Sequence, residues 1–88
     1  MATVVIRHRV GNFDTWLAGH QDRVNAFTPL VTSFKTFRDA NDPNAIAMVM
    51  EVTDLAKLAE MVNDPKLKPF KEKHTVIEPI TVSMEVAV

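Results

Sequence analysis

The alternation of apolar and polar side chains divides the chain into strand-like and helix-like segments. Residues 3–10 are rich in β-branched side chains and end at Gly11-Asn12, which predicts a strand. From Phe13 to Phe27, large side chains recur at offsets of 0, 3, 4, 7, 11 and 14, the period of one amphipathic helix. We expect Asn12 to cap this helix and Pro29 to end it.

The second half of the chain repeats this arrangement around a hairpin. Residues 31–39 alternate polar and apolar, residues 45–53 are almost continuously apolar, and the turn formers of residues 41–44 lie between them. A second helix is expected from an Asp54 cap to Asn63-Asp64-Pro65, followed by a short helical segment over 66–74. The alternating residues 79–88 predict the closing strand.

The order β-α-β-β-α-β predicts an α+β, ferredoxin-like fold in a single domain over residues 1–88. Its four-stranded antiparallel sheet has the order 4-1-3-2, so the first and third strands, which are the most apolar, should be central. Both helices would cover one face and leave an apolar patch on the other. We therefore expect a homodimer in which two sheets face each other across a twofold axis and form a dimeric α+β barrel.

Composition narrows the function classes. Ten Lys and Arg against eleven Asp and Glu give a net charge of −1, so neither nucleic acid nor a membrane is an expected partner. The absence of cysteine excludes a disulfide framework, a thiolate nucleophile and Cys-ligated metals. The three histidines are isolated and no Gly-rich phosphate loop is present, so no metal or other cofactor is expected. The longest apolar run, Ala45–Met50, falls far short of the ~20 residues of a membrane span, and we expect a cytoplasmic protein.

Three separated stretches carry a family resemblance: VIRHRVGNFDTW (5–16), FRDANDPNAIAMVMEVTD (37–54) and DPKLKPF (64–70). They resemble the histidine-bearing first strand, the hairpin and the short helix of dimeric α+β-barrel proteins related to the antibiotic-biosynthesis monooxygenases. The resemblance implies their fold and a small-molecule pocket. The chemistry of this superfamily is diverse and includes cofactor-free oxygenation, haem degradation, lactone isomerisation and polyketide cyclisation.

The chain departs from the family's better-defined chemistries. Phenol-oxidising members rely on a Trp and an Asn around the second helix, with Tyr assisting. Here Asn63 lacks a neighbouring Trp, the sole Trp16 lies in the first predicted helix, and there is no Tyr. Haem-degrading members use an Asn, Trp and His set, of which only His74 has a counterpart position. The resemblance therefore implies neither of these two reactions.

Two histidines are the candidate catalytic residues. His20 lies in the apolar stripe four residues after Trp16, and is either a structural histidine or a pocket group that exchanges protons near neutral pH. His8 is either structural or converges with His20, if its face of the first strand meets the helices. His74 is either a solvated loop residue or a pocket residue. The candidate ligand-pocket residues are Trp16, Phe27, Met48 and His74.

Two functions remain open. One is an enzyme acting on an apolar aromatic or polyketide-like small molecule as a cofactor-independent monooxygenase, a cyclase or an isomerase, with His8 or His20 transferring protons. The other is a non-catalytic ligand-binding or stress-associated dimer. RNA recognition is not expected, because the aromatic signature of RNA-binding domains with this topology is missing.

Overall fold

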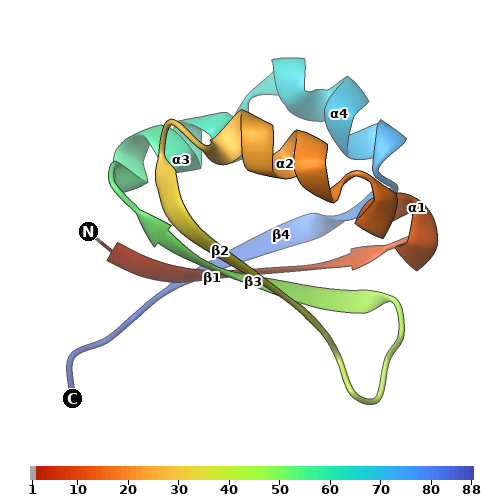
Figure 1. Cartoon of the computed structure of the whole chain (residues 1–88), viewed down its shortest axis with the longest axis horizontal. Coiled ribbons are helices and arrows are strands. Elements are labelled where there is room, and N and C mark those ends of the chain that lie inside the picture. Colours follow the sequence, from red (N-terminus) through yellow and green to blue (C-terminus); the bar gives the residue numbers. More distant parts are fainter. Residues whose placement is uncertain (1) are drawn as a thin grey trace.

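Helices cover one face of a four-stranded antiparallel sheet in the computed structural model, which describes residues 2–88 (Figure 1). The strands are β1 (Ala2–Val10), β2 (Val31–Arg38), β3 (Ala45–Val52) and β4 (Val76–Met84), in the order β2-β3-β1-β4. The helices are α1 (Phe13–Ala18), α2 (His20–Phe27), α3 (Leu55–Asn63), the 3₁₀ helix η1 (Pro65–Leu67) and α4 (Lys68–Lys73). This is the predicted ferredoxin-like α+β fold, with the predicted strand order read from the other edge.

The two central strands place their most apolar faces beneath the helices. β1 and β3 pair antiparallel, with Ile6 opposite Met48 and His8 opposite Ile46. All four of these side chains are buried. The face of β1 that the sequence pattern left open is therefore settled, because His8 and Ile6 lie on the helix side of the sheet.

The predicted caps form. The Asn12 side chain accepts a hydrogen bond from the backbone N–H of Thr15 at 3.0 Å, and Asp54 accepts one from the N–H of Lys57 at 3.1 Å. Each satisfies a backbone donor that the first turn of its helix leaves without a partner. These polar side chains therefore fix where α1 and α3 begin.

The single helix predicted from Phe13 to Phe27 is wrong, because the chain forms two helices that break at Gly19. Gly19 has φ −84° and ψ 7°, so its ψ lies outside the helical range. A β-carbon at this position would lie 2.5 Å from Nε2 of His74, so the ring of His74 packs directly on the backbone. Trp16 and His20 lie on opposite sides of this break and have different neighbours, since the Trp16 ring contacts His8 and the His20 ring contacts Phe34.

The last strand begins and ends earlier than predicted, at Val76 and Met84 instead of residues 79 and 88. Pro79 lies within β4, which tolerates a missing backbone donor because it is an edge strand with a register shift against β1. One backbone hydrogen bond follows Met84, from the N–H of Glu85 to the Thr3 carbonyl close to the start of β1. The predicted short helical segment forms, with Pro69 in the first turn of α4, where its missing N–H costs little.

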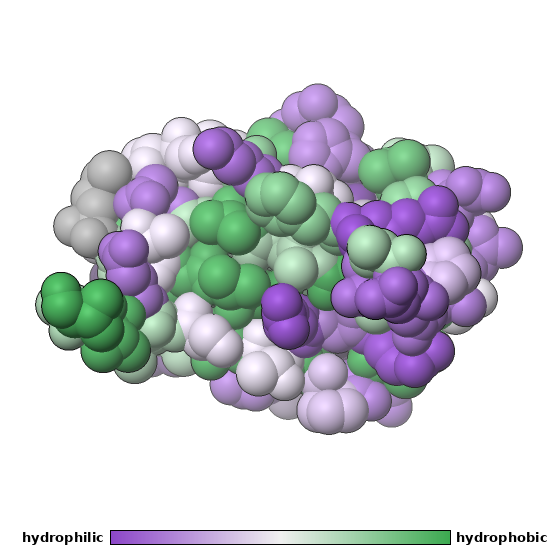
Figure 2. Space-filling view, turned by 90° about the horizontal axis from the view of Figure 1, so that it is seen from below, coloured by the Kyte–Doolittle hydropathy of each residue, from purple (hydrophilic) through white to green (hydrophobic). Residues whose placement is uncertain are grey.

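The sheet face opposite the helices is uncovered. Figure 2 shows an apolar patch at the centre of this face with polar side chains around it. Phe37 and Ile77 are 51% and 47% exposed. Among residues 2–88, none of the helices has the length and apolar character required to cross a membrane.

Candidate functional site

A cavity of about 40 Å³ lies between the sheet and the helix layer. It is lined by Ile6, His8, Trp16, Arg23, Phe27, Met48, Val62, Leu67, Phe70, Lys71, His74, Val76 and Ile80. The candidate residues that the structure brings together here are His8, Trp16, Phe27, Met48 and His74. The wall is mostly hydrocarbon, and its ionisable side chains are two imidazoles, a guanidinium and an ammonium group.

His8 contributes a neutral imidazole with a fixed tautomer. Its Nδ1 lies 2.9 Å from the carbonyl oxygen of Arg9. Because a carbonyl can only accept, Nδ1 carries the proton, and Nε2 of the neutral ring keeps its lone pair. Burial lowers the pKa of His8, the bond to the Arg9 carbonyl raises it, and the charges of Arg23 and Lys71 lower it. His8 is therefore an unprotonated base at neutral pH.

Arg23 contributes a buried positive charge. Its side chain is 3% exposed, and its Cζ lies 3.9 Å from the centre of the Trp16 ring. Within the described residues no carboxylate forms an ion pair with it, and its Nε and Nη2 have no hydrogen-bond partner. Burial lowers the pKa of Arg23 to about 10 and Asp22 raises it, so the guanidinium stays charged at neutral pH. Buried charges are normally paired.

His74 connects Arg23 to the surface. It caps the C-terminus of α4 and is 2% exposed, so the solvated-loop alternative is wrong. Its Nδ1 lies 3.4 Å from Nη1 of Arg23, which can only donate, so the proton of the neutral ring is on Nε2. Nε2 lies 4.0 Å from the carboxylate of Asp22, which is 56% exposed. Burial and then Arg23 lower the pKa of His74, Asp22 raises it and Lys73 lowers it.

The other polar side chains of the wall differ in whether they have partners. Nζ of Lys71 donates to the Val62 carbonyl at 2.7 Å and to Glu78 at 3.3 Å, so its charge is paired. The indole N–H of Trp16 is buried and has no partner in the part of the chain that the structure describes. The cavity wall thus holds N–H donors that nothing accepts.

His20 lies outside the cavity. It begins α2, and its ring meets that of Phe34 edge-on, with centroids 5.7 Å apart. The expected convergence of His8 and His20 in the cavity is therefore wrong, because the His20 ring packs on Phe34 while His8 lines the cavity. Asn63 also points away, because its side-chain amide donates to the Ala59 carbonyl on the exposed surface of α3.

Arg23, which is not among the residues predicted from the sequence, is the ionisable side chain of α2 that reaches the cavity. It stands ten residues after Phe13 and seven after Trp16, and both spacings lie on the same helical stripe. A charged residue on an apolar stripe is the signal that could have identified it.

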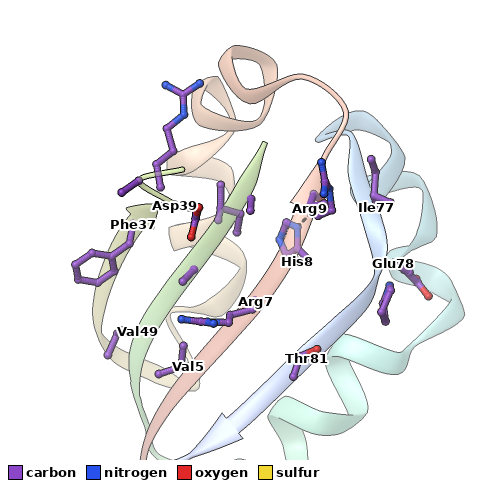
Figure 3. Close-up of a pocket in the computed structure, with 16 residues that line it drawn as sticks. Val5, Arg7, His8, Arg9, Phe37, Asp39, Val49, Ile77, Glu78 and Thr81 are labelled. Carbon is purple, nitrogen blue, oxygen red and sulfur yellow. Dashed lines mark hydrogen bonds between the residues drawn. The ribbon is translucent and has the colours of Figure 1, made fainter. Parts of the chain in front are cut away.

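A second, wider hollow of about 670 Å³ lies on the open face of the sheet. Figure 3 shows that its walls come from all four strands, with Phe37 on β2, Val49 on β3, Arg7 on β1 and Thr81 on β4. His8 borders both this hollow and the cavity under the helices. No group of three or more His, Asp or Glu side chains in residues 2–88 could hold a metal ion.

No family model and no curated protein matches the sequence. Solved structures do match. One antibiotic biosynthesis monooxygenase is 23% identical with a TM-score of 0.68, covering 100% of this chain and 99% of its own. A putative antibiotic biosynthesis monooxygenase from Bordetella bronchiseptica is 14% identical with a TM-score of 0.75, covering 99% and 96%. SnoaB, a cofactor-independent oxygenase from Streptomyces nogalater, is 13% identical with a TM-score of 0.69, covering 99% and 92%. The chain therefore has the fold of the antibiotic biosynthesis monooxygenase structures, as the resemblance in its sequence implied.

Proposed function

We propose that this protein is a small-molecule enzyme that removes a proton from an aromatic or polyketide-like carbon acid without a cofactor. The observation that carries the proposal is the neutral, buried imidazole of His8, whose Nε2 is free to accept a proton at the cavity wall. The likeness of fold to a cofactor-independent oxygenase supports the same reaction class.

The chemistry needs one base and an acceptor for the electron pair. His8 takes a proton from a methylene next to a carbonyl, and the C–H electron pair becomes that of an enolate. In an oxygenase the enolate reduces dioxygen. The two methylene hydrogens and one oxygen atom leave as water, and the other oxygen atom remains as a ketone. In a cyclase or an isomerase the same enolate attacks a second carbonyl or is protonated elsewhere, so the first step is shared.

The cavity must enlarge to admit such a substrate, because about 40 Å³ is far below the ~300 Å³ at the lower end of ligand sites. η1 and α4 form one wall through Leu67, Phe70 and Lys71. Neither η1 nor α4 contains a buried residue, so the chain opens here at the least cost in buried contacts. We place substrate entry on this side.

The open sheet face supports a homodimer as the working form. Apolar side chains gather at its centre (Figure 2), and Phe37 and Ile77, which line the hollow of this face from the two edge strands, are half exposed. Monomeric proteins rarely leave a patch of this kind in water. A second copy, related by a twofold axis, offers an identical and self-complementary face. Sheet-to-sheet packing would then enclose the hollow that His8 borders.

The test follows oxygen uptake and substrate absorbance with a panel of anthrones and hydroxynaphthoquinones, using the purified chain and His8→Asn. Asparagine keeps a donor for the Arg9 carbonyl but removes the Nε2 base. We expect His8→Asn to lower turnover about 100-fold or more. The matched control is His20→Asn, outside the cavity, which should leave turnover unchanged. Equal turnover by all three proteins would reject His8 as the base.

A non-catalytic ligand-binding dimer is the second candidate, and the side chain of Asn63, which bonds to the Ala59 carbonyl and points away from the cavity, favours it. It predicts ligand-induced thermal stabilisation with no product from any member of the panel. A ligand present at 100 times its dissociation constant adds about 2.7 kcal/mol to the free energy of unfolding. Stabilisation together with product formation would exclude this candidate.

A further inference from the structure

The guanidinium of Arg23 is a buried charge of the cavity with no carboxylate in ion-pair contact among residues 2–88, and the exposed Asp22 acts on it only at longer range. Lys71, on the same wall, donates to a carbonyl and to the carboxylate of Glu78. Arg23 has a weak contact to His74 and no carboxylate partner in residues 2–88. An uncompensated buried charge lowers the stability of the folded chain. A positive charge that is kept in the fold despite this loss of stability indicates a ligand whose negative charge neutralises it.

The free edge of the guanidinium defines the geometry of that ligand. Nη1 points to His74, and the atoms without partners are Nε and Nη2. The Nε–H and the adjacent Nη2–H are parallel, and this edge binds planar oxyanions through two hydrogen bonds. The Trp16 ring stacks on the guanidinium at 3.9 Å and fixes its plane, and the indole N–H is a further unpartnered donor.

We propose that Arg23 and Trp16 form a receptor for a single oxyanion of an organic ligand, an enolate or a carboxylate, with His74 as a positioning residue. One unpaired positive charge matches one negative charge. A phosphate dianion would leave a net negative charge buried. The remaining wall, with Ile6, Phe27 and Met48, suits the hydrocarbon part of the ligand. The inference rests on the proposed function in using the same cavity, but it does not require turnover.

The experiment compares charged ligands with neutral ones of the same shape, by calorimetry on the unmodified chain. The first pair is the hydroxynaphthoquinone lawsone, ionised at neutral pH, and its neutral methyl ether. The second pair is naphthoate and naphthamide. We expect at least one anion to bind about 10- to 100-fold more tightly than its neutral counterpart. A preference in the first pair identifies an enolate site, and a preference in the second identifies a carboxylate site.

Substitutions test whether Arg23 is the source of the preference for anions over neutral ligands. Arg23→Met should abolish it, and Arg23→Lys, which keeps the charge but loses the parallel N–H pair, should retain part of it. The matched control is Arg38→Met. Arg38 also stacks on an aromatic ring, with Cζ 3.8 Å from the centre of Phe13, but it is exposed. Without ligand, Arg23→Met should melt no lower than the parent chain, since it removes an uncompensated charge.

Three results would overturn the inference: no anion preference in either pair, including no binding at all; a preference that survives in Arg23→Met; or a lower melting temperature of ligand-free Arg23→Met. These outcomes are separable from failure of the proposed function. An Arg23-dependent preference without turnover would reject the enzyme and keep the receptor. Turnover that depends on His8 without any charge preference would reject the receptor alone.

Discussion

Gly19 and His74 pack against each other without an intervening side chain. A β-carbon on Gly19 would lie 2.5 Å from Nε2 of His74 and 2.8 Å from its two neighbouring ring carbons. Real β-carbons do not approach a ring this closely, because the interior is close-packed and such an overlap forces a shift. Gly19 therefore sets the position of His74, and His74 in turn holds Nη1 of Arg23 at 3.4 Å.

We predict that Gly19→Ala displaces the His74 ring and lowers the free energy of unfolding by about 1–3 kcal/mol, the usual cost of overpacking. Urea denaturation followed by circular dichroism measures this. Gly11→Ala is the matched control, because a β-carbon there meets its nearest atom, on Thr75, at 3.6 Å, an ordinary contact. It should change stability by about 0.5 kcal/mol or less. Equal effects of the two substitutions would contradict this role of Gly19.

The parts of the fold that could be predicted from the sequence are those that local patterns of side chains determine. The near-continuous apolar run of β3 marked a central strand, and Asn12 and Asp54 marked helix starts through hydrogen bonds to residues three positions on. Such signals depend on near neighbours in the chain, so they can be recognised without knowing the tertiary structure. The strand order followed once the element order was known.

The errors have a tertiary origin. The predicted helix breaks at Gly19, where the ring of His74, which is far away in the sequence, packs on the backbone. The predicted helical stripe was defined by its apolar side chains and His20. Arg23 was passed over, although its position lies on the same stripe and its side chain reaches the cavity. The His8, Trp16 and Met48 candidates line the cavity because their orientation depends on a single element each.

Stability should fall with acid, because the folded chain holds His8 and His74 with lowered pKa values. Burial is the main cause in both. Arg23 and Lys71 also lower the pKa of His8. For His74, Arg23 and Lys73 lower the pKa and Asp22 raises it. The unfolded chain, with histidine pKa values near 6.5, then binds more protons than the folded chain below that pH.

The free energy of unfolding should therefore be highest above about pH 6.5 and decrease as the pH is lowered from there. Urea titrations between about pH 7.5 and about pH 5 measure the slope. His8→Asn and His74→Asn each remove one of the responsible groups and should each make the slope shallower. A slope that is unchanged in both variants would show that other groups cause the acid sensitivity.

The homodimer proposal predicts that a charge on the open face separates the subunits. Ala47 lies on β3 and lines the hollow of that face, so Ala47→Glu would bury a carboxylate between two sheets. Light scattering after size exclusion should give about twice the 9.9 kDa chain mass for the parent and the single-chain mass for the variant. Ala56→Glu, the same substitution on exposed α3, should remain dimeric. A parent chain of single-chain mass at micromolar concentration would refute the dimer.

Trp16→Phe tests whether the indole N–H itself contributes to oxyanion binding, separately from the size of the Trp16 ring. Phenylalanine keeps a ring for the Arg23 guanidinium but has no donor. We expect the preference for lawsone over its methyl ether to fall about 3- to 10-fold, the loss of one hydrogen bond, and not to disappear, because the guanidinium edge remains. Phe27→Leu also removes volume from the cavity wall but removes no donor, so it should keep the full preference. If both variants lowered the preference equally, the effect would come from packing and the indole N–H would have no part in the receptor.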